Sequence, residues 1–549
     1  MAAIHAAKRG ADVLLVEKGV FGKSGCTILG GYSCNAALGL ADKRDNPRVH
    51  FEDTVREGKF LSDQTLVDVY TSEAPDRIYE LYEYGARFEK VDDHFAQGVM
   101  PGSTHPRACF IDDRTGQALM AALRREASHQ EKIRIHHETI VTRLVLEDGR
   151  VVGATALRLR NTQPVCYSAK ATVIATGGGS QLFQYSTTSV DNTGDGLILA
   201  FDAGAELQDM EFVQFYPTVQ CYPRLLGLNP TAPAGLRLQA RARIYNAEGR
   251  DFVEEKIADW HLKATRDVLA QMVYQEIMEG RGTPHGGVFI DVSHLPPEEV
   301  EREFACNGFF DKLLRMGIDL RTDPIETGVA AHYFMGGTKV NDRCETAAPG
   351  LFAAGEAMAG VDGANRLGGN ALSEILVFGA RAGDYAADYA AGAPRHPRLG
   401  KVEFLEPIPR HYESDEERVR PVRLKRAIQR IMWEKVGVIR EGASLQQASE
   451  ELEDLERKQL GRLMMHSQLK VYNREVLDSI EVRRMMILAQ IIAAAASMRR
   501  ESRGAHARVD HPHRDYKEWL VNLVVRKEEE GFSISKAPVR LDKLQVEEQ

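Results

Sequence analysis

Hydrophobic residues at the start of the chain follow first a helical and then a strand pattern. Residues 1–10 place alanine and isoleucine on one side, which predicts a helix, and residues 11–18 form an apolar run that predicts a buried strand. The strand ends in Glu17 and Lys18. A helix followed by a strand ending in an acid is typical of the second half of a nucleotide-binding βαβ unit, where the acid binds ribose hydroxyls.

The first half of that unit is not found in the pattern. It requires a strand and a Gly-x-Gly-x-x-Gly turn directly before the helix, whereas the sequence begins inside the helix at Met1. We therefore expect that the start codon was assigned too far downstream or that the chain was shortened, with roughly 10–20 residues missing. The loop that cradles a pyrophosphate is expected to be missing with them.

Both periodicities recur further along the chain. Amphipathic patterns predict helices over residues 51–61 and 66–84. Alternating apolar residues predict strands over 133–137 and 138–153, with a hairpin turn inside the second segment. An apolar strand over 171–179 runs into three glycines, where the backbone can approach a ligand closely.

The C-terminal half is mainly helical in pattern. Periodicity near 3.6 predicts helices within residues 257–280, 419–464 and 471–499, and a short strand is expected over 286–291. Residues 385–406 contain Gly, Pro and Arg with weak periodicity, which predicts a linker.

Composition indicates a globular protein of several domains. The 549 residues suffice for two to four domains, and contents of 43% hydrophobic and 27% charged residues are ordinary. The net charge of −9 argues against a nucleic-acid partner. No apolar run approaches about 18 residues and no signal peptide opens the sequence, so we expect a cytoplasmic protein. Seven scattered cysteines without a Cys-x-x-Cys pair indicate reduced thiols and no metal held by this chain alone.

Residues 363–372 combine one arginine with small residues and glycines. Such glycines let the backbone approach a flat ligand, and a helix starting near Asn370 would aim its N-terminal dipole at an anionic group. Arg366 is a planar, permanently charged fork suited to a carboxylate. A second stretch, residues 326–337, carries His332 before two glycines.

Together these stretches resemble the flavoprotein subunits of succinate dehydrogenase and fumarate reductase, with L-aspartate oxidase and adenylylsulfate reductase as relatives. The resemblance covers nearly the whole chain. The motifs that carry it lie at residues 17–18, 175–178, 194–196, 209–215, 266–267, 332–337, 363–372 and 501–508.

The resemblance implies an α/β fold. A Rossmann-like FAD-binding domain, with its first strand and Gly-rich loop truncated, would contain an inserted α+β capping domain and be followed by a C-terminal helical domain. We expect the FAD-binding domain over residues 1–234 and 349–400, the capping domain over 235–348, the helical domain over 401–510 and a C-terminal segment over 511–549.

FAD is the cofactor that the resemblance implies. Succinate dehydrogenases attach it covalently to a histidine, but alignment on Gly30 and Gly31 puts Ser24 at that position, and the nearest histidines are His5 and His50. We therefore expect non-covalent FAD with a potential lower than in covalent enzymes, which favours reduction of a substrate. The residues expected to bind FAD are Glu17, Lys18, Ser24, Thr27, Gly30, Gly31, Thr176, Gly177, Gly178, Asp195, Glu356, Arg366, Ala371 and Leu372.

Four residues are expected to act on the substrate. In the family, hydride passes between flavin and a carbon next to a carboxylate-activated double bond. The resemblance implies that His332 and Arg366 grip a carboxylate and that Arg266 supplies the proton. Fumarate reductases have Gln-Phe-His-Pro-Thr where this chain has Tyr216 in place of the histidine. Tyr216 donates one hydrogen bond but carries no positive charge near neutral pH.

A second family motif, Thr-Glu-Gly-Ala-Arg-Gly-Glu-Gly, lacks a match. Its first Thr and Glu touch substrate or relay protons, whereas residues 235–243 contain no glutamate. Either Arg241 or Arg243 would replace the relay arginine, and a solvated basic strand is an equal alternative.

Three functions remain open from the sequence. The first is a fumarate reductase-like or succinate dehydrogenase-like catalytic subunit that exchanges electrons with an iron–sulfur partner. It would be attached to the inner face of the membrane only through an anchor subunit. The second is a relative acting on another small carboxylic acid, with L-aspartate oxidase activity among the possibilities. The third is a structural flavin subunit of a larger redox complex.

Overall fold

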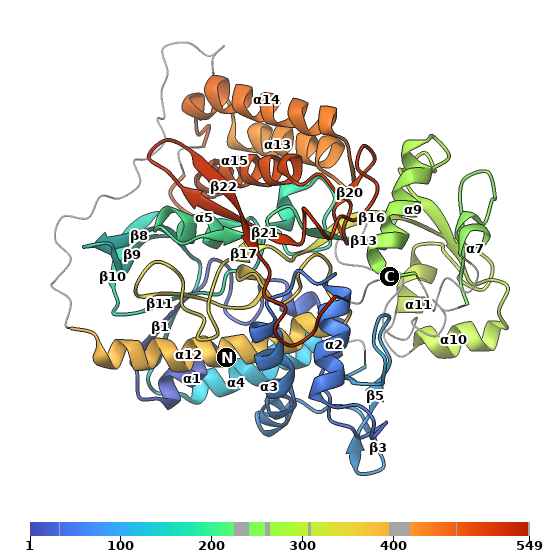
Figure 1. The fold of residues 1–549 in the computed structure, drawn as a ribbon, viewed down its shortest axis with the longest axis horizontal. Coiled ribbons are helices and arrows are strands. Elements are labelled where there is room, and N and C mark those ends of the chain that lie inside the picture. The colour runs from blue at the N-terminus through green and yellow to red at the C-terminus, as the bar shows by residue number, and fades with distance from the viewer. Residues whose placement is uncertain are drawn as a thin grey trace.

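The structure, a computed structural model, describes residues 1–31, 33–112, 114–223, 241–257, 264–305, 309–394, 418–467 and 469–546. Strands fill the middle of the molecule, with one layer of helices below and another above (Figure 1). A smaller lobe lies to one side, at the right of Figure 1, and contains α7, α9, α10 and α11.

Parallel strands and the lower helices form the body of the expected nucleotide-binding domain. The strand β1 (Val13–Val16) pairs in parallel with β7 (Ile133–His136), and β11 (Thr172–Ile174) pairs in parallel with β18 (Leu351–Ala353). The helices on this side are α1 (Ala2–Lys8), α2 (Pro47–Glu57), α3 (Gln64–Glu83), α4 (Thr115–His129) and α12 (Asn370–Gly392). The predicted α/β architecture is confirmed.

An antiparallel sheet lies beside these strands. It is built from β8 (Thr139–Glu147), β9 (Arg150–Arg158) and β10 (Gln163–Ser168). The turn between the first two strands holds Asp148 and Gly149 at φ of 49° and 73°, the left-handed pair that a type I′ hairpin requires. The predicted hairpin is therefore confirmed. Its neighbour α5 (Asp195–Asp202) contacts β8.

A four-stranded antiparallel sheet joins the body to the lobe. Its order is β13 (Val213–Tyr222), β16 (Ile325–Phe334), β15 (Val288–Asp291) and β14 (Arg243–Tyr245). The helix α9 (Arg266–Met278) packs on β13 and β16. The lobe is completed by α7 (Phe252–Lys256), α10 (Pro297–Ala305) and α11 (Phe309–Arg315).

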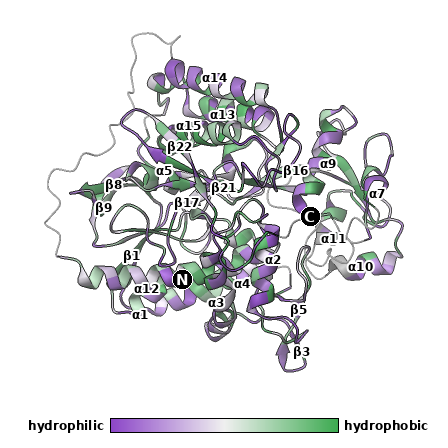
Figure 2. Ribbon diagram, in the orientation of Figure 1, coloured by the Kyte–Doolittle hydropathy of each residue, from purple (hydrophilic) through white to green (hydrophobic). Residues whose placement is uncertain are grey.

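The upper layer is helical, as the pattern predicts. The helices α13 (Pro421–Lys435), α14 (Gly442–Gln459) and α15 (Arg474–Met498) pack on one another. Only Leu445, Ala448 and Leu452 of α14 are buried, and its outer face is hydrophilic in Figure 2. A hairpin of β21 (Val521–Lys527) and β22 (Phe532–Pro538) extends a sheet with β12 (Leu207–Gln208) and β17 (Gly337–Thr338).

Short elements complete the described chain. They are β2 (Ser33–Asn35), β5 (Gln97–Gly98) and β6 (Ala108–Phe110) in one sheet, the pair β3 (Lys90–Val91) and β4 (His94–Phe95), the pair β19 (Ile439–Arg440) and β20 (Ala507–Arg508), and the 3₁₀ turns at Thr27–Leu29, Ser180–Leu182, Gly355–Ala357 and Leu460–Arg462. No helix in the described ranges is both long and apolar enough to cross a bilayer.

Several predicted boundaries are wrong. The linker expected from residue 385 is still helix as far as Gly392, because Tyr385 and Tyr389 pack on the apolar core; from residue 395 the prediction lies outside the described residues. The helix expected over 51–61 is α2, which begins at Pro47 and ends at Glu57. The helical pattern over 419–464 is confirmed as two helices, α13 and α14, separated by residues 436–441.

The predicted helix over residues 257–280 is α9, which begins only at Arg266. Residues 258–263 lie outside the described residues. This late start places Arg266 in the first turn of the helix, and that position matters for the candidate site.

Candidate active site

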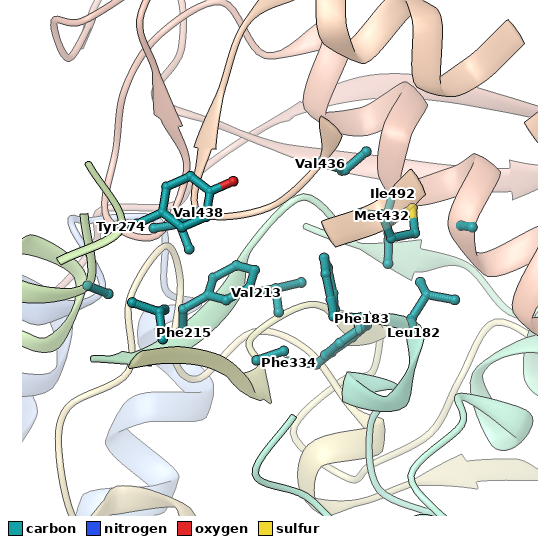
Figure 3. Packing of buried hydrophobic residues seen from close by; sticks show 14 of the residues in the cluster. Leu182, Phe183, Val213, Phe215, Tyr274, Phe334, Met432, Val436, Val438 and Ile492 are labelled. Carbon is teal, nitrogen blue, oxygen red and sulfur yellow. The ribbon is translucent and has the colours of Figure 1, made fainter. Parts of the chain in front are cut away.

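The strands β13 and β16 separate an apolar core from a cluster of polar side chains. Val213 and Phe215 of β13 lie in one cluster with Phe183, Tyr274 and Met432 (Figure 3). Because side chains alternate along a strand, Gln214 and Tyr216 face the opposite side. Those two polar residues contact the predicted catalytic arginines. The alternation of apolar and polar residues along β13 therefore turns Gln214 and Tyr216 toward the arginines.

Four predicted catalytic residues come together on that side. The Arg266 guanidinium lies 5.3 Å from the centre of the Tyr216 ring, and the ring of Tyr216 meets that of His332 edge-on at 5.1 Å. Arg366 lies 4.4 Å from the centre of the Tyr333 ring. Burial lowers the pKa of His332 well below its ordinary value, and the charges of Arg366 and Arg266 lower it further. Both arginines therefore act on one neutral histidine.

His332 is oriented by Thr187. The Thr187 hydroxyl lies 2.7 Å from His332 Nδ1. When the hydroxyl donates to Nδ1, the neutral ring carries its proton on Nε2 and can donate it to a carboxylate. Thr187 was not among the predicted residues, because no sequence motif marks it.

Arg366 is fixed by an amide and an aromatic ring. Its Nη2 donates to Gln214 Oε1 at 2.9 Å, and Gln214 Nε2 donates back to the Arg366 carbonyl at 3.1 Å. Only 5% of Arg366 is exposed, and its Nε makes no hydrogen bond within the described part of the chain. A buried guanidinium with unused donor capacity is suited to an anionic ligand.

Two carboxyl groups lie behind Arg366. The Tyr333 hydroxyl donates to Glu374 Oε2 at 3.2 Å. Burial raises the pKa values of Asp362 and Glu374, although the positive charge of Arg366 opposes the shift at both groups. Glu374 therefore favours its neutral form, and the pair offsets the charge of Arg366 only in part.

The loop of residues 363–369, here called the Arg366 loop, is held by close contacts at both ends. A Cβ on Gly363, whose φ is 54°, would lie 2.5 Å from the Gly58 carbonyl oxygen. At the other end Gly369 has a φ of 89°, and a Cβ there would lie 2.3 Å from Asn35 Oδ1. The helix α12 begins directly after, at Asn370, as predicted. Only glycine satisfies both demands at these positions.

One end of the expected cofactor site is marked by Glu17. Its carboxylate accepts the Gly19 amide proton at 2.9 Å and the Ser24 hydroxyl proton at 3.2 Å. The position aligned with the covalent histidine thus lies at the end of β1, against the acid expected to bind ribose. Ser24 also donates to the Val20 carbonyl at 3.0 Å.

Glu356 marks the other end. Its Oε1 accepts the Phe334 amide proton at 3.1 Å, and Asn192 Nδ2 lies 3.4 Å from Oε2. Burial raises the pKa of Glu356 to about 7. A Cβ on Gly178 would lie 2.5 Å from Glu356 Oε1, so the glycine strand end and this acid are in contact.

The loop after β1 links these two ends. The Cys26 thiol contacts the side chain of Asn192, and a Cβ on Gly30 would lie 3.4 Å from the Leu372 side chain. Seven of the predicted cofactor residues are half-buried or exposed: Thr27, Gly30, Gly31, Thr176, Gly177, Ala371 and Leu372. A strip of accessible backbone, flanked by glycines that leave no room for side chains, fits FAD.

Lys18 and Asp195 belong to an ion network with α15. Lys18 Nζ lies 2.7 Å from Asp195 and 3.0 Å from Glu481, and Arg484 lies 3.0 Å from the other oxygen of Asp195. These contacts give both residues a role in joining the nucleotide-binding body to the helical layer. Their contact with FAD stays a prediction.

Both candidate relay arginines are exposed, and the choice between them stays open. Arg241 forms an ion pair with Glu299 of α10 and is half exposed, and Arg243 is an exposed residue of β14. Residues 235–240 lie outside the described residues.

Comparison with known protein families identifies the class of protein to which this chain belongs. Residues 1–372 match the family model described as "FAD binding domain", and residues 425–549 match the model described as "Fumarate reductase flavoprotein C-term". With the glycine-lined strip and the cationic pocket, these matches define an FAD-dependent oxidoreductase.

Relatives along the whole chain narrow the class. The CoM/CoB fumarate reductase subunit of Methanothermobacter marburgensis is 37% identical, over 96% of this chain and 95% of the relative. The fumarate reductase flavoprotein subunit of Mycobacterium tuberculosis is 33% identical, with coverages of 95% and 91%. The chain belongs to the family of succinate dehydrogenase and fumarate reductase flavoprotein subunits.

Solved structures agree with this assignment. Mycobacterium smegmatis Sdh1 in complex with UQ1 superimposes with a TM-score of 0.87 at 34% identity, covering 99% of this chain and 92% of that one. A quinol–fumarate reductase with menaquinol molecules gives 0.87 at 26% identity, with coverages of 99% and 96%. The predicted family resemblance is confirmed.

Proposed function

We propose that this protein is a catalytic flavoprotein subunit that reduces the carbon–carbon double bond of a small unsaturated dicarboxylic acid of the fumarate type. The observation that carries the proposal is the convergence of Arg266, Arg366, His332 and Tyr216 on one pocket. Two guanidinium groups and a neutral histidine provide directional donors for carboxylate oxygens.

Each residue has a distinct part in this proposal. FAD, when bound, supplies the hydride chemistry. Arg366 and His332 hold one carboxylate and withdraw charge from the double bond, and Tyr216 offers one neutral hydrogen bond to the second carboxylate. Arg266 gives a proton to the second reacting carbon. An arginine can act as an acid only because hydride addition creates a strongly basic centre in a closed site.

An electron-transfer partner is part of the proposal. The relatives from M. marburgensis and M. tuberculosis are named as subunits, and those names support a role in a larger assembly. We expect an iron–sulfur subunit to exchange electrons with the flavin, and attachment to the inner face of the membrane only through an anchor subunit. Co-purification of the tagged native complex, followed by iron analysis, tests this.

FAD is expected to be held without a covalent bond. Ser24 stands at the position of the attachment histidine and bonds to Glu17 and Val20. Among the nearby histidines, His5 bonds to Glu80 and Asp384, and His50 bonds to Asn370. Acid precipitation should release the yellow cofactor, whereas flavin fluorescence on the protein band of a denaturing gel would exclude this.

The substrate assay uses flavin-loaded protein and reduced viologen as the electron donor. We expect viologen oxidation with fumarate or a close unsaturated dicarboxylate, and none with the matching diamide. Oxygen-dependent oxidation of aspartate without viologen turnover would instead support an L-aspartate oxidase-like enzyme. No turnover of any acid by fully loaded protein would support the structural-subunit alternative.

A further inference from the structure

A guanidinium that gives up a proton has to recover one in every catalytic cycle. Arginine holds its proton strongly, so a neutral Arg266 side chain would take a proton from any acid in contact with it. The Arg266 side chain is half-buried, with the Tyr216 ring on one face. The source of that proton is therefore a question that rests on the proposed function and deepens it.

Glu57 is the last residue of α2 and is linked through Asn365 to the first turn of α9. Its Oε1 accepts a hydrogen bond from Asn365 Nδ2 at 2.7 Å, and the same amide nitrogen lies 3.1 Å from Asp267 Oδ1. Asn365 precedes Arg366, and Asp267 follows Arg266. One amide therefore holds Glu57 next to both arginine-bearing segments.

The backbone strengthens this placement. The Ala364 amide donates to the Gly58 carbonyl at 3.0 Å, so the end of α2 is bonded directly to the Arg366 loop. A Cβ on Gly58 would lie 2.2 Å from Ser62 Oγ and 3.0 Å from the Asp362 carbonyl oxygen. The tight turn fixes the backbone directly after Glu57.

The surroundings of Glu57 suit a proton carrier. Burial and, to a smaller extent, the Asp267 carboxylate raise the pKa of Glu57, Lys59 and Arg266 lower it, and the net result is a pKa of about 7. An acid with a pKa near the working pH both accepts and donates protons readily. Asn365 bridges Glu57 to Asp267, the residue that follows Arg266, so the carboxyl lies beside the first turn of α9.

Glu57 also has a side that leads toward solvent. Lys59 Nζ lies 3.3 Å from Glu57 Oε2, with 18% of the Lys59 side chain exposed against 11% of that of Glu57. The carboxyl therefore has one oxygen bonded inward to Asn365 and the other beside a lysine near the surface. A proton can enter on the Lys59 side and leave toward Arg266.

We propose that Glu57 returns the proton to Arg266 after each substrate reduction. The O–H bond of the Glu57 carboxyl breaks and an N–H bond of the Arg266 guanidinium forms, which leaves a carboxylate that solvent protonates again. No electrons move in this step. Asn365 is a positioning residue that keeps the carboxyl in place. In substrate oxidation the same proton would travel from Arg266 to the Glu57 carboxylate.

The test compares Glu57→Gln with Glu52→Gln in the flavin-loaded holoenzyme. Glutamine keeps an oxygen that accepts from Asn365 but cannot carry the proton. Glu52 lies on the outer face of the same helix, paired with Arg48 and Arg56, and serves as the matched control. The measurements are kcat and KM from pH 5.5 to 9, with the acid that the wild type reduces.

In the wild type, kcat of reduction should fall as the pH rises through about 7, because Glu57 is then deprotonated. Glu57→Gln should lower kcat at least tenfold with KM and flavin content nearly unchanged, and the fall of kcat with rising pH, the pH-dependent limb, should disappear. Glu52→Gln should retain the wild-type kcat and the pH-dependent limb. Wild-type kcat and an unchanged limb in Glu57→Gln would overturn the proposal.

If Glu57→Gln loses its flavin, a second variant, Glu57→Asp, tests the proposal. Glu57→Asp keeps a carboxyl group in a shorter side chain, so its limb should persist with a displaced midpoint; a midpoint identical to that of the wild type would overturn the proposal. Failure of the proposed function is a separate result, because it would appear as inactivity of the wild type on every acid.

Discussion

Two regions of the molecule bury arginines, and the groups that bond to the guanidinium differ between them. In the C-terminal region Arg499 Nε lies 2.6 Å from Glu211 Oε1, and its Nη1 lies 3.0 Å from Glu501, which also binds Arg503 at 2.7 Å. In the pocket Arg366 donates to the neutral amide of Gln214 and stacks on Tyr333. The first region pairs its arginines directly with carboxylates, and the second bonds Arg366 to a neutral amide.

This difference separates a structural ion cluster from a binding site. Burying an ion costs several kcal/mol unless partners offset it, and the carboxylates of Glu211 and Glu501 do so around Arg499. Around Arg366 the neighbouring carboxyls of Asp362 and Glu374 have pKa values raised by burial. A carboxylate from outside the chain would therefore gain more from Arg366 than from any arginine of the C-terminal cluster.

The largest expected effect is on the C-terminal cluster. Arg499→Gln leaves Glu211 and Glu501 buried with less compensation, which should cost about 3–5 kcal/mol of unfolding free energy. Urea unfolding of the flavin-loaded protein measures it. Arg366→Gln is the matched variant and should cost clearly less. Equal losses for the two variants would remove the distinction between the regions.

Arg266→Gln should lower kcat by about 10²–10³, the usual consequence of removing a donor that acts in the transition state. Substrate affinity and flavin content should hardly change, because the lost interaction forms mainly during the reaction. The control is Arg241→Gln, since Arg241 is paired with Glu299. A similar loss of kcat in Arg241→Gln would support Arg241 as the relay arginine.

Arg366→Gln is expected to affect binding as well as rate. A hydrogen bond to a charged group is worth about 1.5–3 kcal/mol, so KM should rise about tenfold or more while kcat also falls. Arg366→Lys keeps the charge but not the planar fork, and should recover only part of the loss. Steady-state kinetics of both variants test this, and an unchanged KM would contradict the proposed grip on a carboxylate.

Tyr216→His should give the smallest effect, a few-fold gain on fumarate. A histidine there would stand beside Arg266, whose charge favours the neutral ring, as it does for His332. The gain should therefore grow as the pH falls from 8 to 6, where more of the histidine is protonated. Fumarate reduction at both pH values measures it. Tyr216→Phe is the control, and an equal gain there would exclude a cationic donor as the cause.

Residues within compact motifs could be predicted from the sequence. Arg366, His332 and the helix starting at Asn370 stand in glycine-rich stretches whose chemistry is local, and the structure brings Arg266 and Tyr216 to them.

Contacts between distant segments could not be predicted. Pairing of β21 with β12 joins residues more than 300 positions apart, and no pattern in either strand specifies its partner. Glu57 had no sequence signal either, since a glutamate at a helix end is ordinary; only folding places it beside Asn365.

The most direct test of the central claim is a binding titration that needs no turnover. Succinate is added to oxidised, flavin-loaded wild type, Arg366→Gln and Arg499→Lys while the flavin absorbance is followed. The account predicts a saturable spectral change in the wild type, retention in Arg499→Lys if it stays folded, and at least tenfold weaker binding in Arg366→Gln. Equal dissociation constants for the wild type and Arg366→Gln would contradict the claim that Arg366 forms a carboxylate site.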